Sequence, residues 1–158
     1  MRTPTDVLRA ARPAAILSTL GFSLALAGCA STPTPIPKDT LAISGPTLGT
    51  RQLRPAHCYS GEHFVFLGAQ VVDDASKTEA RLVIDPVAGP VVRIFESEHG
   101  DDASIVLRKK DCRVFDTGLR RTGSWTNGIN EVALTLTLDC RTRHGDVVRG
   151  STTQQSCE

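Results

Sequence analysis

The segment from Glu131 to Asp139 constrains the fold more than any other part of the chain, because its apolar residues recur at every second position. These residues are Val132, Leu134, Leu136 and Leu138. A period of two puts apolar side chains on one face of a β-strand and polar side chains on the other. The segment therefore predicts a strand with one buried face and one face in water.

Several shorter segments of similar character are separated by turn signals such as Asn127-Gly128 and Gly89-Pro90. Further strands are predicted at 64–72, 81–85, 91–95, 104–109, 113–117 and 147–152. No window beyond residue 41 has the apolar stripe of a helix. About seven strands with short turns predict an all-β fold, an antiparallel β-sandwich or a small barrel. The segment 41–53 stays open between a first strand near 41–44 and further linker.

The first 28 residues have the plan of an export signal. Arg2, Arg9 and Arg12 precede thirteen uncharged residues, from Ala14 to Leu26. Thirteen helical residues reach about 20 Å, whereas a membrane span needs about 30 Å. We therefore expect the segment to direct export and to be unable to span a membrane permanently.

The signal ends in Leu26-Ala27-Gly28-Cys29, and here the chain resembles the lipobox of bacterial lipoproteins at all four positions. The resemblance covers residues 1–29. It implies cleavage before Cys29, a diacylglyceryl thioether on its sulfur and a further acyl chain, such as palmitate, on its amine. Two or more acyl chains hold a protein stably on a bilayer.

The same resemblance carries an expectation about location. In lipoproteins of this type an Asp directly after the cysteine favours retention at the inner membrane, and this chain has Ala30. We therefore expect a membrane-anchored protein on the periplasmic or cell-surface side, at the outer membrane rather than the inner.

The predicted organisation has three parts: a signal peptide at 1–28 that is removed, a lipidated Cys29 with a tether at 29–40, and a β domain at 41–158. The tether contains three prolines between Ala30 and Thr40. Proline fixes φ and removes a backbone donor, which favours extended and solvated chain.

Four cysteines remain once Cys29 is assigned to lipid, and an exported chain meets an oxidising environment. They are Cys58, Cys112, Cys140 and Cys157. Their spacing lacks CxxC or CxxH pairs, so we expect two disulfides and no metal. We favour Cys112 with Cys140 and Cys58 with Cys157, and the other connectivities stay open.

The register of the hairpin around Asn127-Gly128 does not follow from the sequence. A loop centred at Thr126 would place Cys112 opposite Cys140. A two-residue turn at Asn127-Gly128 would instead place Phe115 opposite Cys140 and leave Cys112 about 10 Å away, beyond the reach of a disulfide.

The charge of the chain argues against nucleic acid as a partner. Without the leader, 15 basic and 16 acidic residues remain, a net charge of −1. Nucleic-acid-binding domains normally have a basic face. Short basic groups at 108–110, 120–121 and 141–143 have aspartates beside them, which is typical of solvated edge strands that resist aggregation.

Two clusters contain side chains of the kinds that bind metals or act in catalysis, and we expect neither cluster to be a functional site. His57, Cys58, Glu62 and His63 suggest a metal set or a cysteine–histidine pair, yet Cys58 is needed for a disulfide. The second cluster is an acidic loop that suggests a Ca²⁺ site. It lacks the alternating spacing that places several oxygen ligands around one ion. Its residues are Glu96, Glu98, His99, Asp101 and Asp102. Ser60-Gly61 and Ser124 lack an identifiable base. No catalytic, metal or cofactor-binding residue is predicted.

The sequence therefore predicts a lipoprotein with a non-enzymatic β domain that binds a partner or serves as surface structure. The bilayer is one partner, and an envelope protein or polysaccharide is another. The spacing Cys140, Gly145, Gly150, Cys157 is similar to that of small β-rich bacterial lipoproteins without assigned activity. One alternative is an inhibitor of a cell-wall hydrolase, since the chain resembles periplasmic lysozyme inhibitors in size, lipidation and disulfides. Thr122-Gly123-Ser124 is the nearest counterpart of their recognition loop. The other alternative is an envelope hydrolase.

Overall fold

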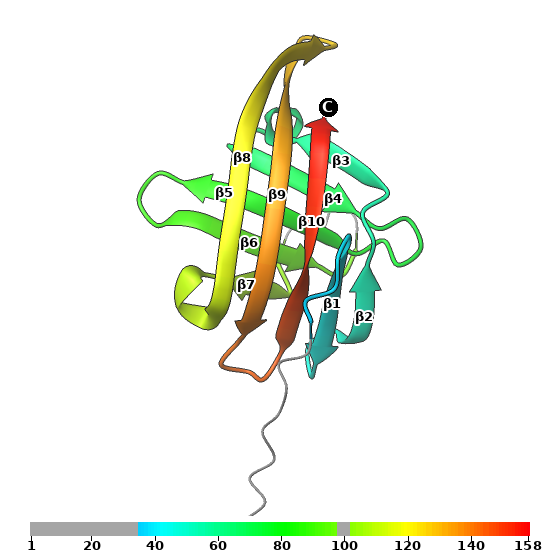
Figure 1. Cartoon of the computed structure of the whole chain (residues 1–158), viewed down its shortest axis with the longest axis vertical. Helices are drawn as coiled ribbons and strands as arrows, with labels where there is room; N and C mark the ends of the chain where they lie inside the picture. The colour runs from blue at the N-terminus through cyan, green and yellow to red at the C-terminus, as the bar shows by residue number, and fades with distance from the viewer. Residues whose placement is uncertain (1–34, 98–101) are drawn as a thin grey trace, which may run out of the picture. The chain divides into compact units, whose positions relative to one another are not determined.

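The computed structural model describes residues 35–97 and 102–158 of the chain (Figure 1). These residues form ten β-strands and two short 3₁₀ turns. The strands are β1 (Thr40–Gly45), β2 (Gly49–Leu53), β3 (His57–Ser60), β4 (Gly68–Val72), β5 (Glu79–Asp85), β6 (Gly89–Phe95), β7 (Ile105–Leu107), β8 (Cys112–Thr126), β9 (Ile129–Arg141) and β10 (Val147–Cys157). The 3₁₀ turns are η1 (Gly61–Phe64) and η2 (Lys109–Asp111).

The strands make two antiparallel sheets of five strands each, which face one another as a sandwich. Sheet A has the order β2-β1-β10-β9-β8, and sheet B has the order β3-β4-β5-β6-β7. Figure 1 shows the strands of sheet B crossing behind those of sheet A. The prediction of an all-β antiparallel fold is confirmed, and of its two forms, a sandwich or a small barrel, the structure has the sandwich.

About seven strands were predicted and ten are present, because β2 and β3 were not recognised and β1 was left open. The open question over 41–53 is resolved as a hairpin of β1 and β2. The strand predicted at 64–72 is limited to Gly68–Val72, because the preceding residues form η1 and a turn. Val65 closes η1 with φ of 59°, a left-handed conformation that no extended strand can continue.

Strand β9 supplies the centre of the hydrophobic core. Its alternating residues Val132, Leu134, Leu136 and Leu138 are all buried, as the period of two predicts. They belong to one cluster with apolar residues of sheet B, including Leu82, Val92 and Ile94. Each such side chain contributes about 1.5–3 kcal/mol by leaving water, so the facing leucines and valines join the two sheets.

The turn between β8 and β9 is the two-residue turn at Asn127-Gly128. Both residues have positive φ, 53° and 83°, and Thr126 pairs directly with Ile129 across them. Positive φ at both central positions is the conformation of the type I′ turn that suits a hairpin.

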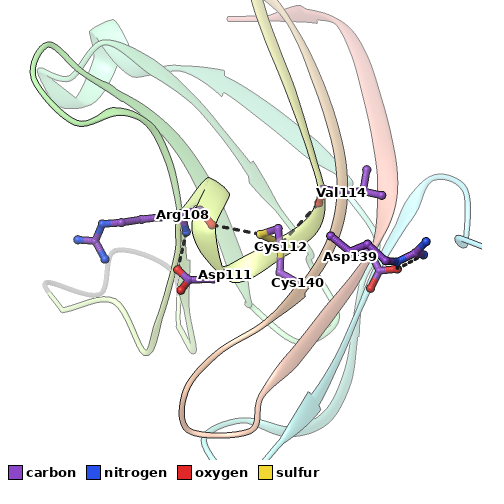
Figure 2. The surroundings of a disulfide bond; sticks show 7 residues. Arg108, Asp111, Cys112, Val114, Asp139 and Cys140 are labelled. Atoms are coloured by element: carbon purple, nitrogen blue, oxygen red, sulfur yellow. Dashed lines mark hydrogen bonds and ion pairs between the residues drawn. A yellow bond between two sulfur atoms is a disulfide. The ribbon is translucent and has the colours of Figure 1, made fainter.

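The disulfide between Cys112 and Cys140 nevertheless forms, because two bulges shift the register of β8 (Figure 2). From Arg121 to Trp125 strand β8 advances four residues while β9 advances two. Next to the disulfide, β8 advances two residues while β9 advances one. The tight turn and the cysteine pairing, which the sequence presented as alternatives, therefore occur together.

A second disulfide joins Cys58 to Cys157. It links β3, at one edge of sheet B, to the end of β10 in sheet A. Backbone hydrogen bonds flank it, from Ser60 N to Glu158 O at 2.8 Å and from Glu158 N to Cys58 O at 3.3 Å. Both disulfides match the favoured connectivity.

The last residues of the predicted tether lie along β10. The carbonyl oxygen of Pro37 accepts hydrogen bonds from the backbone nitrogen of Ser151 at 2.9 Å and from its hydroxyl at 3.3 Å. The chain thus enters the domain at the middle of β10 and then runs into β1, which starts at Thr40.

Candidate functional site

The cluster of His57, Cys58, Glu62 and His63 does not form a site. His57 pairs with Asp74 at 3.0 Å, and Cys58 is in a disulfide. The ring of His63 stands edge-on to Tyr59, with centroids 6.4 Å apart. Within residues 35–97 and 102–158 no group of three or more His, Cys, Asp or Glu side chains is placed to hold a metal ion.

The acidic loop is only partly described. Glu98, His99 and Asp101 lie outside the described residues, as does Cys29 with the whole signal peptide. The carboxylate of Glu96 pairs with Arg51 at 2.6 Å, and Asp102 is exposed.

The basic groups separate onto different parts of the fold. Arg108 and Lys110 belong to η2 and the residue before it, whereas Arg120 and Arg121 lie on β8. In Figure 2 the side chain of Arg108 points away from the Cys112–Cys140 disulfide, and its backbone nitrogen donates to Asp111 at 3.0 Å.

Asp146 organises one end of the sandwich. Its carboxylate is buried and accepts hydrogen bonds from the backbone nitrogen of Thr47 at 3.0 Å, the Thr47 hydroxyl at 2.9 Å and the Thr142 hydroxyl at 3.1 Å. Burial alone would raise the pKa of Asp146, but these hydrogen bonds outweigh it and hold the pKa below its usual value. The carboxylate ties the β1–β2 turn to the β9–β10 turn, which is a structural role.

A polar hollow of about 400 Å³ opens beside Asp146, which is one of its lining residues. Its lining combines residues within and directly before β7 and η2 with the β9–β10 turn, among them Ser104, Arg108, Arg143 and His144. His144 is hydrogen-bonded to the neighbouring Arg143 at 3.0 Å. The charges here are solvated turn residues, so the hollow by itself defines no ligand.

The opposite end of the molecule carries the tip of the β8–β9 hairpin, which we define as residues 122–130. Figure 1 shows this tip projecting beyond the rest of the sandwich. Trp125 lies on it with 65% of its surface exposed. Thr122-Gly123-Ser124 forms the bulge next to Trp125, and the hydroxyl of Thr122 accepts from the Ser124 nitrogen at 3.1 Å. Tryptophan is among the residue types that most often dominate the binding energy of protein interfaces, so Trp125 marks the tip as a candidate contact.

Two carboxylates brace the base of the hairpin tip. Glu62 of η1 accepts hydrogen bonds from the backbone nitrogen of Asn130 at 3.1 Å and from its side-chain amide at 3.0 Å. Glu131 accepts from the hydroxyls of Thr126 at 2.5 Å and Ser156 at 2.7 Å. These hydrogen bonds lower the pKa of Glu62 and of Glu131 below their usual values. The base of the tip is therefore tied to η1 through Glu62 and to β10 through Glu131.

A cleft of about 370 Å³ lies below the tip, between β8 and the region of η1, β4 and β5. Most of its lining is apolar, with Glu62 and Arg121 as the charged groups. The residues are Ser60, Glu62, Phe66, Leu67, Gly68, Ile84, Leu119, Arg121 and Val132. Leu67 is 61% exposed and its neighbour Val65 is 95% exposed. The hydroxyl of Ser60 accepts from the Glu62 nitrogen at 3.5 Å, so it caps η1.

The tip and the cleft are two neighbouring candidate binding surfaces, since no residue of the tip lines the cleft. Sequence reasoning named Thr122-Gly123-Ser124 and missed Trp125 and the cleft. The place of Trp125 two residues before the Asn127-Gly128 turn was a usable signal, because a residue flanking a hairpin turn is exposed. The cleft had no such signal, since its residues come from five separate segments.

No protein-family model, no curated protein and no solved structure matches this chain. Residues 35–97 and 102–158 contain no helix that is long and apolar enough to cross a membrane.

Proposed function

We propose that this chain is a lipoprotein anchored through Cys29, whose β-sandwich binds another protein of the cell envelope through the hairpin tip. The observation that supports the binding role is the exposure of Trp125 on a projecting and braced hairpin. The lipobox Leu26-Ala27-Gly28-Cys29 supports the anchor.

The position of the tip suits a tethered protein. The chain enters the domain beside Ser151, which pairs with Thr137 of β9. Thr137 lies eight residues along β9 from Ile129 at the turn, a distance of about 27 Å. A domain held by its tether would therefore present the tip well away from the point where the tether joins it.

Trp125 is the side chain on which binding should depend most. Tryptophan combines a large apolar area with little rotamer entropy, and truncation of a central one typically costs 2 kcal/mol or more in binding. We expect Trp125→Ala to weaken partner binding by about 30-fold or more.

The test uses the soluble mature chain, residues 29–158 with Cys29→Ser, as bait for envelope extracts. Val87→Ala is the matched control, because Val87 is a 95% exposed apolar residue on a different turn. Proteins retained by the parent and by Val87→Ala, but lost with Trp125→Ala, support the proposal. Retention of the same proteins by all three baits, or of none by the parent, contradicts it.

The anchor is tested separately in the full chain. Mass spectrometry of the native protein should find a mature chain that begins at residue 29 with acyl chains attached, and Cys29→Ser should abolish this acylation. A native mature chain with an unmodified thiol at that position would remove the anchor from the proposal.

A second candidate function, inhibition of a cell-wall hydrolase, is favoured by the location of Thr122-Gly123-Ser124. This segment lies on the projecting tip, where it could enter the cleft of an enzyme. Lysozyme activity measured with tens of micromolar soluble chain tests it. Full lysozyme activity at that concentration would eliminate lysozyme as the target.

A further inference from the structure

Strand β8 forms an open edge of sheet A. Among residues 35–97 and 102–158 it pairs only with β9, although it is 15 residues long. Along such an edge every second residue directs its backbone N–H and C=O groups away from the sheet, where they can pair with another strand.

The inward face of β8 leads directly into the cleft below the tip. Leu119 lies opposite Leu134 of β9, and Arg121 lies opposite Val132, so both follow the side of sheet A that faces the core. Both also line the cleft, together with Ile84 of β5. A strand added beside β8 would direct alternate side chains into this space.

Sheet B underlies the position that an added strand would take. Figure 1 shows β5 and β6 crossing behind β8 and continuing past it to their shared turn. A folded second copy paired at β8 would bring its own second sheet into the space of this overhang, because packed sheets are only about 10 Å apart. A single extended segment fits there, since it needs only the width of one strand.

The outward face of β8 has a charge pattern that would favour an added strand with complementary charges. Asp116, Gly118 and Arg120 occupy successive outward positions, and all are exposed. Arg120 has no ion-pair partner within 4 Å among residues 35–97 and 102–158. Opposite charges placed directly across two antiparallel strands stabilise the pairing, and like charges destabilise it.

We propose that the edge of β8 and the cleft form an acceptor for one extended segment of a partner protein, which adds to sheet A as an antiparallel strand. The segment has apolar side chains on its inward face, an acidic residue opposite Arg120 and a basic residue opposite Asp116. The proposal rests on the binding role proposed above, but it uses a surface separate from Trp125.

The test measures binding of two synthetic peptides to the soluble mature chain by calorimetry. The first is acetyl-Phe-Glu-Leu-Thr-Val-Lys-Val-amide, which runs antiparallel to residues 115–121 with its Glu opposite Arg120. The second exchanges Glu and Lys and keeps composition, length and apolar positions. Amide hydrogen exchange locates the bound peptide, because added backbone hydrogen bonds slow exchange along β8.

We expect the first peptide to bind at least about tenfold more tightly than the second, because two cross-strand pairs change from attractive to repulsive. In the double variant Arg120→Glu, Asp116→Lys this preference should reverse. Equal binding of both peptides, a preference that survives the double variant, or no binding of either at 1 mM would overturn the proposal. The pull-down with the Trp125→Ala bait tests the tip contact without the peptides, so failure of peptide binding is distinguishable from failure of the proposed tip contact.

Discussion

The two disulfides should differ in their contribution to stability, because they close loops of very different length. Cys58 and Cys157 are 99 residues apart, and Cys112 and Cys140 are 28 apart. In the chain-entropy treatment a loop of about 100 residues contributes about 4.7 kcal/mol and one of about 29 residues about 3.6 kcal/mol. Removal of Cys58–Cys157 should therefore cost about 1 kcal/mol more than removal of Cys112–Cys140.

The structure makes this a well-matched comparison. Each disulfide joins one fully buried cysteine, Cys157 or Cys140, to one half-buried cysteine, Cys58 or Cys112. Replacement of each pair by alanine therefore leaves similar native-state defects. The difference between the two variants isolates the effect of loop length on the unfolded chain.

The assay is urea unfolding of the soluble mature chain and the two double-alanine variants, with the m-value fitted separately for each. All three are measured in the same concentration of sucrose, which keeps a destabilised variant folded at zero urea. A larger cost for removal of Cys112–Cys140 would refute the loop-length reasoning. So would a cost below about 1 kcal/mol for removal of either pair.

Three further predictions concern stability. Asp146→Asn should make the free energy of unfolding depend less on pH between pH 6 and 3. Because folding lowers the pKa of Asp146, the carboxylate stabilises the fold above its ordinary pKa near 4, and this stabilisation is lost as the pH falls through the pKa of the folded state. Unfolding measured from pH 6 to 3 tests this. Gly150→Ala should prevent correct pairing of β1 with β10, because a Cβ would lie 1.8 Å from the Thr40 carbonyl oxygen, and loss of amide protection in β1 reports it. Gly118→Ala is the control, because its Cβ would make only an ordinary contact of 3.6 Å with the Thr135 side chain. Leu136→Ala should lower the free energy of unfolding by about 2–5 kcal/mol, whereas Thr135→Ala on the exposed face should change it by less than about 0.5 kcal/mol in urea melts.

The fold class was readable because it depends on local chemistry. The alternation from Val132 to Leu138 has only one arrangement that buries all four apolar side chains, and it appears in β9 without exception. Strands β2 and β3 were missed because they are short and polar. They are strands because β1 and β4 offer them hydrogen-bonding partners.

The candidate site was predictable only in part. Thr122-Gly123-Ser124 attracted attention through composition, and its location on the hairpin tip follows from the adjacent turn. The cleft unites residues as distant in sequence as Ser60 and Val132, and no local pattern encodes that proximity. The Glu62–Asn130 brace likewise joins residues 68 positions apart.

By itself the sequence determined the strand character of the chain and the parity of its cysteines, because alternation is a property of a single segment and the number of thiols can be counted without a structure. The tertiary structure alone decided that the tight Asn127-Gly128 turn and the Cys112–Cys140 bond coexist. The extra residues of β8 can be absorbed as bulges only where sheet packing and the disulfide stabilise both ends of the strand, and that balance involves the whole sandwich.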